Sequence, residues 1–296
     1  MPAPPEKRLL INLHNDSADV YVPDGTPLDE ALARTTHLGI GAHQDDLEFM
    51  ALHGILACYG RKRRWFSGVI CTSGSGSART GPFSDHSDEQ MRDVRVQEQR
   101  QAAELGKYSS ILQLDHASGT IKDPSNRHLR DDIVAILQAT DPQVIYTHNP
   151  ADKHPTHIAV LVNVIRAMRE MAPEKRPKQV LGCEVWRGLD WMLDGDKVAL
   201  DCSPRERLAL QLSRVFQSQI AGGKQYDLAA LGRRRANATY FDSHNVDTAR
   251  QIAFAMDLTP LIMDPSRDII DYVTSYISRF ADNVRDNLRR QMGDAP

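Results

Sequence analysis

Short apolar runs alternate with longer amphipathic stretches up to about residue 171, and this alternation constrains the fold more than any other feature. The apolar runs have the length of buried strands: "HLGIGA" (37–42), "WFSGVICTSG" (65–74), "SILQLD" (110–115) and "QVIYTH" (143–148). The stretches that follow them have helical spacing: 45–60, 88–105, 127–140 and 155–171. This order predicts a Rossmann-like α/β fold, with a mostly parallel sheet covered by helices on both faces.

The chain divides into three predicted parts. Residues 1–35 are expected to form two strands and a short helix packed on the core, and residues 36–220 the main domain. Residues 221–296 are expected to form a helical extension of the same domain. The fold is thus expected to carry a C-terminal extension of helices and strands, with the strands before residue 221. At its end, apolar residues recur at helical spacing: Ile269, Val273, Ile277, Phe280, Val284 and Leu288. This pattern predicts an amphipathic helix that is buried on the core or on a second subunit.

Polar side chains crowd the ends of three predicted strands. "AHQDD" follows 37–41, "TSGSGSARTG" follows 65–71 and "HNPADKHPTH" follows 143–146. Sites in open parallel sheets form where loops leave the C-terminal ends of the strands. We therefore expect these three segments to meet at one crevice.

The first and third of these segments carry residues that bind metals. His43 and Asp46 are three positions apart at a strand-to-helix turn, and His154 and His157 are three apart at a helix start. Two histidines and one carboxylate with an open position form the ligand set of a catalytic zinc site. Asp45 then remains as a spare carboxylate beside the ion, where a general base is needed.

Four further residues are candidates for supporting roles in this crevice. Glu48 is expected either to brace a ligand or to stabilise the start of its helix. Arg79, in the Gly/Ser loop, is either a contact for a sugar hydroxyl or phosphate or a solvated loop residue. His148 and Asp152 lie in the loop of His154 and are expected to line the crevice.

Two motifs in this order resemble the LmbE-like, PIG-L-type family of zinc-dependent de-N-acetylases. They are "AHQDDLE" and "HPTH", and between them "RVQEQRQAAELG" is similar to the Arg, Glu, Ala and Leu-Gly pattern of that family. A later "FQSQI" is similar to a Ser-Gln element of the same family. The resemblance covers residues 36–220. It implies a hydrolase that removes the acetyl group from an N-acetylglucosamine unit.

The resemblance also implies roles for individual residues. His43, Asp46 and His157 would hold one Zn²⁺ per chain, or another divalent transition metal. Asp45 would be the general base, and His154 would stabilise the oxyanion or protonate the leaving amine. The sequence departs from the family at Gln44, which replaces the usual Pro, at Thr156, which replaces the Asp of HPDH, and in its C-terminal segment, which has no counterpart there.

Thr156 cannot supply a negative charge to its neighbour His154 as the family Asp does. We expect Asp152, two residues before His154, to supply that charge instead.

Composition narrows the choice of partners and compartments. The net charge is −3 over 296 residues, which gives no general attraction to nucleic acid, and no apolar run is long enough to span a membrane. Four widely spaced cysteines and an N-terminus without a signal-type apolar region lead us to expect a cytoplasmic protein with reduced thiols. The expected partner is a small N-acetylated sugar, for which Trp186 and Trp191 offer aromatic surfaces, and the C-terminal helix is a candidate contact in a homo-oligomer.

Three other functions remain open on the residues alone. One is a metal-dependent amide hydrolase that acts on a non-sugar substrate. Another is a Rossmann-like nucleotide-binding module, because "LGIGA" before a helix resembles half of a glycine-rich fingerprint. The last is a non-catalytic sugar-binding protein.

Overall fold

A computed structural model describes residues 11–221 and 223–293, and it is built around one eight-stranded sheet with the order β1-β4-β3-β2-β5-β6-β8-β7. The strands are β1 (Asp19–Tyr21), β2 (His37–Gly41), β3 (Phe66–Thr72), β4 (Ser110–His116), β5 (Val144–His148), β6 (Gln179–Cys183), β7 (Val198–Asp201) and β8 (Ile252–Asp257). From β4 to β6 neighbouring strands are parallel, whereas β1 and β8 pair antiparallel to their neighbours. The predicted α/β fold with a mostly parallel sheet is confirmed.

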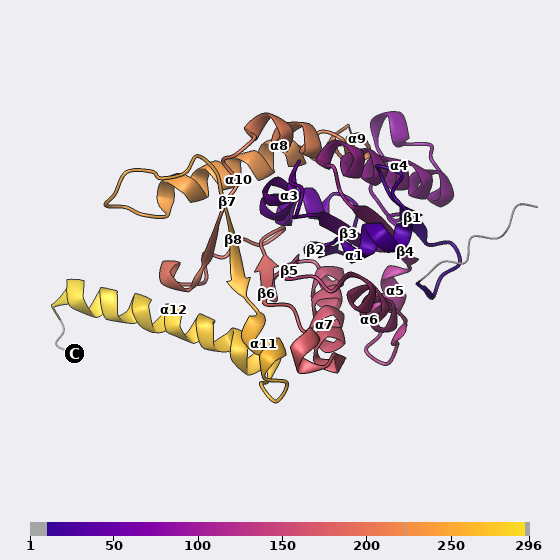
Figure 1. Ribbon diagram of the computed structural model, residues 1–296. Coiled ribbons are helices and arrows are strands. Elements are labelled where there is room, and N and C mark those ends of the chain that lie inside the picture. The colour runs from indigo at the N-terminus through magenta and orange to yellow at the C-terminus, as the bar shows by residue number, and fades with distance from the viewer. Residues whose placement is uncertain (1–10, 222, 294–296) are drawn as a thin grey trace, which may run out of the picture.

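Helices cover both faces of this sheet, with α3, α4 and α8 on one side and α5, α6 and α7 on the other (Figure 1). The helices are α1 (Leu28–Ala33), α2 (Asp46–Met50), α3 (Leu52–Cys58), α4 (Asp88–Gly106), α5 (Ser118–Lys122), α6 (His128–Thr140), α7 (Pro155–Glu170), α8 (Glu206–Ser213), α9 (Gln217–Ile220), α10 (Tyr226–Tyr240), α11 (Thr259–Met263) and α12 (Ile269–Met292). Three short 3₁₀ turns join them at Gly81–Phe83, Pro173–Lys175 and Asp194–Asp196.

Two apolar cores form, one on each face of the sheet. In β3, Val69 and Cys71 belong to the core beneath α6 and α7, whereas Phe66 and Ile70 belong to the core beneath α3 and α4. This alternation follows from the two-residue period of a strand, and it explains why the strands of a sheet covered on both faces are apolar throughout. At Gly39 in β2, an added Cβ would lie 2.9 Å from the Leu47 side chain, so glycine lets α2 approach the strand closely.

The order of the strands reverses on either side of β2. From β2 the chain moves outward to β3 and β4, and it then returns to place β5 and β6 on the other side of β2. The loops that follow β2 and β5 therefore diverge at a topological switch point, where open α/β sheets leave a crevice.

Several elements differ from the sequence prediction. The helix predicted at 45–60 is broken at Ala51, whose φ of −103° and ψ of 13° are not helical. Before the C-terminal segment, the chain forms two short helices, α8 and α9, separated at residues 214–216; Phe216 is buried there, and Ser218 of α9 reaches α4. The first predicted N-terminal strand begins outside the described residues, and 11–13 carry no strand, whereas the second is β1.

The C-terminal segment also contributes to the sheet. Residues 221–296 were expected to be a helical extension, but they also supply β8, which lies between β6 and β7. The predicted C-terminal helix is α12, and Asp268 caps its N-terminus. It runs outward from the body of the molecule (Figure 1), and Tyr272 is its one buried residue in the part of the chain that the structure describes. Within those same bounds, none of the helices combines the length and the apolar character needed to cross a bilayer.

Candidate active site

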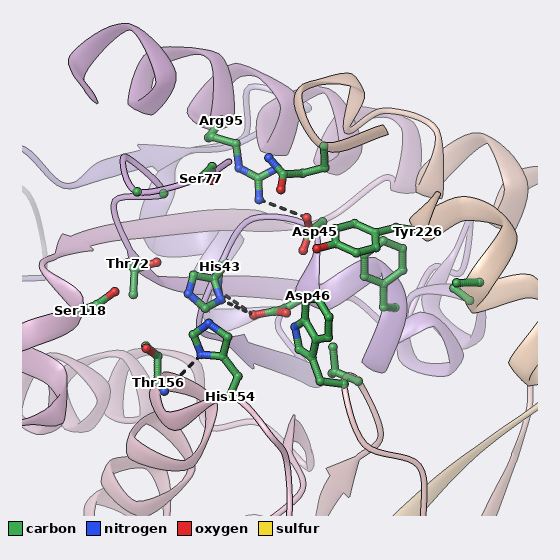
Figure 2. A pocket seen from close by; sticks show the side chains of 18 of the residues that line it. His43, Asp45, Asp46, Thr72, Ser77, Arg95, Ser118, His154, Thr156 and Tyr226 are labelled. Carbon is green, nitrogen blue, oxygen red and sulfur yellow. Dashed lines mark hydrogen bonds and ion pairs between the residues drawn. The ribbon is translucent and has the colours of Figure 1, made fainter. Parts of the chain in front are cut away.

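The loops after β2 and β5 bring three predicted ligands together. His43 Nδ1 lies 3.2 Å from His157 Nε2 and 3.4 Å from Asp46 Oδ2, and the remaining edge, from His157 Nε2 to Asp46 Oδ2, is 3.5 Å. Figure 2 shows His43 and Asp46 side by side at the floor of a cavity. Asp46 is held in this position because its Oδ2 also accepts the backbone N–H of His43 at 2.7 Å.

This triangle has the dimensions of a zinc site. Ligand atoms about 2.0–2.1 Å from a tetrahedral ion are about 3.3–3.4 Å from one another, close to the three edges observed here. Burial alone would raise the pKa of Asp46, but His157 and His148 hold it well below its usual value, so the group is a carboxylate. Two imidazoles and a carboxylate that converge in this way fit a divalent transition metal with an open coordination position.

His148 lies beside the triangle but is not arranged as a ligand. Its Nε2 is 3.4 Å from Asp46 Oδ2, and its ring stacks on His157 at 3.8 Å. The same Nε2, however, accepts the backbone N–H of Ala42 at 2.9 Å, which occupies its lone pair. Burial lowers the pKa of His148 to about 3, so we infer a neutral ring that supports His157 and Asp46 by packing.

Asp152 contacts a different histidine from the one expected. Its Oδ1 accepts the backbone N–H of His154 at 3.0 Å and lies 3.5 Å from His157 Nδ1, while Oδ2 accepts the N–H of Trp186. The expectation that Asp152 pairs with the His154 ring is therefore wrong, because the turn at 152–154 directs the carboxylate to the far side of His157. A carboxylate behind a ligating imidazole is a common arrangement in metal sites, and at 3.5 Å it acts as an electrostatic contact rather than an aligned hydrogen bond.

His154 is oriented by the backbone. It is the N-cap of α7, and its Nδ1 accepts the N–H of Thr156 at 3.3 Å (Figure 2). This contact leaves the proton of a neutral ring on Nε2, the nitrogen on the side of His43, whose ring centroid is 4.8 Å away. Burial, followed by the charges of His43 and His157, lowers the pKa of His154. The main-chain donor orients the ring, but it does not supply the negative charge of the family Asp that Thr156 replaces.

Asp45 occupies a strained position beside the triangle. Its φ of 84° lies in the left-handed region, which is unfavourable for a residue with a side chain. Its backbone N–H donates to Gln99 Oε1 at 3.1 Å, and its Oδ2 accepts from Arg95 at 3.1 Å. Burial raises the pKa of Asp45 to about 6, although Arg95 opposes this shift.

A buried network behind Asp45 fixes Gln99. Gln99 Nε2 donates to Glu48 Oε1 at 3.0 Å, and the hydroxyl of Tyr108 donates to the same oxygen at 2.6 Å. All three side chains are buried. Of the two roles proposed for Glu48, the structure favours bracing, but the braced group is Gln99 and through it the main chain of Asp45, not a ligand. Burial raises the pKa of Glu48 to about 8.

The two other family-like elements contact each other. Glu98, from "RVQEQ", accepts the backbone N–H and the hydroxyl of Ser218, from "FQSQI", both at 2.6 Å. Arg95 lies between them, with Nη1 3.5 Å from Glu98 and 3.3 Å from Ser218 Oγ. This contact docks α9 on α4 and holds the guanidinium against Asp45.

A cavity of about 680 Å³ opens over these groups. His43, Asp45 and Asp46 line its floor, the Ser73–Ser77 loop lines one side, and Phe49, Trp186 and Tyr226 line another. The ring of Tyr226 meets Phe49 and Trp186 edge to face, at 5.7 and 5.8 Å between centroids.

Several residues that were expected at or near the crevice do not line this cavity, among them Arg79, His148, Asp152 and Trp191. Arg79 donates to Ser75 O at 2.8 Å and pairs with Asp88 at the start of α4, so its guanidinium is held by its own surroundings. Of the two tryptophans, Trp186 lines the cavity and Trp191 does not.

Sequence analysis missed Gln99, Tyr108 and Tyr226. Gln99 and Tyr108 belong to a helix and a loop that read as ordinary packing segments, and no local pattern relates them to Asp45. Tyr226 lies on α10, a helix that was not predicted.

Comparison with known proteins agrees with the motifs. Residues 38–168 match a family model described as PIG-L, GlcNAc-PI de-N-acetylase. That span includes both motif segments and ends before the cavity wall formed by α10. The resemblance to the PIG-L, LmbE-like family is therefore confirmed for this domain. A search of curated protein sequences found no match.

Solved structures with the same fold include two deacetylases and one hydratase. The N,N'-diacetylchitobiose deacetylase of Pyrococcus horikoshii has a TM-score of 0.59 at 17% identity, covering 78% of this chain and 86% of its own. The A40926 pseudoaglycone deacetylase has a TM-score of 0.54 at 16% identity, covering 76% and 97%. The 4-carboxy-2-hydroxymuconate hydratase GalB of Pseudomonas putida has a TM-score of 0.58 at 15% identity, covering 76% and 95%. These similarities show the fold, and the hydratase shows that the fold alone does not choose the reaction.

Proposed function

We propose that the protein is a zinc-dependent hydrolase that removes an acetyl group from an N-acetylated amino sugar or its glycoside. The observation that carries this proposal is the triangle of His43, Asp46 and His157, with the Asp45 carboxylate beside it at the floor of one cavity. The match of residues 38–168 to the de-N-acetylase family and the two deacetylases of the same fold support an acetamide as the target.

The roles of the residues follow from their positions. When bound by His43, Asp46 and His157, a zinc ion supplies Lewis-acid polarisation of a carbonyl and a more acidic water. Asp45 then accepts the proton of the attacking water. His154, with its Nε2–H on the cavity side, donates a hydrogen bond to the oxygen that becomes negative, and the proton that Asp45 took from the water passes to the leaving amine. The products are acetate and a free amine.

Nucleotide binding is disfavoured by charge. The Asp46 carboxylate, with Asp45 beside it, lies at the start of α2, where a Rossmann-type module would place the phosphates of its ligand. Carboxylates at that point repel phosphate. A non-sugar amide and a non-catalytic sugar-binding role remain alternatives, and both are tested by the experiment below.

The test combines metal content with product release. Protein purified without added metal should contain about one zinc per chain by atomic absorption, and His157→Ala should lose it. The zinc-containing protein should release acetate from glycosides of N-acetylglucosamine, with N-acetylated amino acids as the non-sugar comparison. Full zinc retention in His43→Ala, Asp46→Ala and His157→Ala would disprove the metal site. Release only from the amino acids would establish the non-sugar alternative, and zinc without any hydrolysis would favour the binding protein.

A further inference from the structure

One face of α10 is directed at the cavity instead of at a core. Tyr226, Ala229, Ala230, Arg233 and Arg234 all line the cavity. Their spacing of three, four, seven and eight positions from Tyr226 defines a single helix face. Two alanines leave space between the tyrosine at one end of this face and the two arginines at the other.

The two arginines have no carboxylate partner within 4 Å in the described part of the chain. Arg234 is only 3% exposed; its Nε donates to Gln251 Oε1 at 3.0 Å, and its Nη2 has no hydrogen-bond partner among the described residues. Arg233 donates to the carbonyl of Val185. The other buried arginine of this cavity, Arg95, pairs with Asp45 instead. A buried cation without a counter-ion is costly, so this end of the cavity calls for an anion.

Glu184 does not neutralise this pair. It is the one carboxylate among the described residues that line this end of the cavity. One carboxylate cannot balance two guanidinium groups, and its Oε1 also accepts from Asn237 Nδ2 at 2.6 Å and from the backbone N–H of Phe254 at 3.1 Å. Burial raises the pKa of Glu184, whereas the charge of Arg233 lowers it. The balance at this end of the cavity remains positive.

The arginines lie further along α10 than Tyr226, the residue of this helix that is next to the reacting groups. The Tyr226 ring lies beside Asp45 (Figure 2), and the charge of Asp45 contributes, after burial, to raising the pKa of Tyr226 to about 12. Arg233 is seven residues further along α10, about 10 Å at the rise of an α-helix. A ligand that reaches from the base to the arginines therefore extends along this face of α10.

We propose that Arg233 and Arg234 bind an acidic group of the substrate, a carboxylate or a phosphate, in the part of the cavity that lies along α10 beyond Tyr226. This inference rests on the proposed function, because it assigns a substrate class to the same cavity. It concerns α10, which lies outside residues 38–168 that match the family model.

The test is a series of N-acetylglucosamine glycosides with one linker that ends in a hydroxyl, a carboxylate or a phosphate. In the zinc-containing wild type, acetate release should show a kcat/KM roughly 10- to 100-fold higher for an acidic member than for the hydroxyl member. Arg233→Gln should abolish that preference mainly through KM, and Arg234→Gln should do the same. Arg235→Gln is the matched control, since Arg235 is on the same helix, bonds Glu206 and does not line the cavity. The better of the two acidic members identifies carboxylate or phosphate as the preferred group.

Equal kcat/KM for the three members in the wild type would overturn the proposal. So would a loss of the same size for all three members in Arg233→Gln, because this would indicate a structural role. If no member releases acetate, the proposed function fails, and the anion site is then judged separately by calorimetry with inorganic phosphate. Binding that weakens at least roughly tenfold in Arg233→Gln but not in Arg235→Gln supports the site, and binding that is absent or equal in all three proteins rejects it.

Discussion

The start of α2 buries charged side chains, whereas the helix α12 exposes apolar ones. At the start of α2, Asp45, Asp46 and Glu48 are 7%, 2% and 1% exposed. On α12, Ile277 and Leu288 are 44% and 58% exposed. Carboxylates are rarely buried and large aliphatic side chains are rarely exposed in rows, so each region carries an energetic cost that needs an explanation.

The two regions differ in whether contacts within this chain offset the energetic cost of these side chains. The buried carboxylates are compensated inside the chain, by Arg95, by Gln99 and Tyr108, and by the histidines around Asp46. Among the described residues, Tyr272 is the one buried residue of α12. The apolar stripe packs on the core only through the partly buried Ile269 and Val273, and its later members are not covered in this way. The first region is a site that this chain completes, apart from its ligand, whereas the second favours a contact with another molecule. Substitutions in the two regions should therefore have different effects: loss of activity at the start of α2, and loss of a contact between molecules on α12.

The most severe test of the self-contained site is Asp45→Asn. The amide keeps the shape of the side chain but cannot take a proton from water, so acetate release should fall by roughly 10²–10⁴ with zinc content unchanged. The measurement is kcat together with zinc stoichiometry. A variant that retains nearly the wild-type rate would show that Asp45 is not the base and would direct attention to Asp152.

The opposite region is tested by Ile277→Asp on α12. If the stripe is a contact between two copies of the chain, the wild type should be a dimer, and a charge in that contact should cost about 3–5 kcal/mol and dissociate it. Sedimentation or light scattering measures the change. Ser278→Asp introduces the same charge next to the stripe, on an exposed position, and should leave the dimer intact. A monomeric wild type would remove the subunit explanation.

The buried network offers a smaller effect of a different kind. Gln99→Leu removes the acceptor of the Asp45 N–H, which holds a residue at a φ of 84°. An unsatisfied buried donor costs about 1–3 kcal/mol, so kcat should fall about 5- to 150-fold while KM changes little. Gln101→Leu, on an exposed position of the same helix, is the control. A matching loss of thermal stability without any change in kcat would mean that Gln99 is structural only.

The sequence was sufficient to predict the parallel part of the sheet and the polar groups at the ends of its strands. Strands covered on both faces must be apolar, and residues at the ends of parallel strands must meet, so HxxD and HPTH could be related without coordinates. Gln99 and Tyr108 could not be related to Asp45 in this way, because a hydrogen bond across 54 residues leaves no periodic trace.

Helix α10 was missed for a reason connected with function. A helix is recognised by an apolar stripe, and the inner face of α10 carries alanine and arginine because it faces a cavity. Prediction of helices from apolar periodicity fails most often at such sites, where the side chains face a ligand cavity instead of an apolar core. Strand β8 was missed as well, since "IAFAMD" lies far from the alternating region and pairs antiparallel with β6 and β7.

His37 provides the mildest test, because it is a partly buried titratable group at the opposite end of β2 from His43 and has no site around it. Burial, followed by the charges of His53 and Arg64, lowers its pKa from 6.5 to about 4. A base with a depressed pKa in the folded state contributes stability that is complete above about pH 6.5 and is lost as the pH falls toward 4. Between pH 7 and pH 5 this loss is about 2 kcal/mol. Urea unfolding should therefore show a smaller decrease in the free energy of unfolding for His37→Gln than for the wild type, whereas His244→Gln, on an exposed position, should follow the wild type. An equal decrease in all three proteins would show that the protonation of His37 does not contribute to the loss of stability at acid pH. The energetic cost of buried polar groups would then have to be sought at Asp45, Asp46 and Glu48 instead.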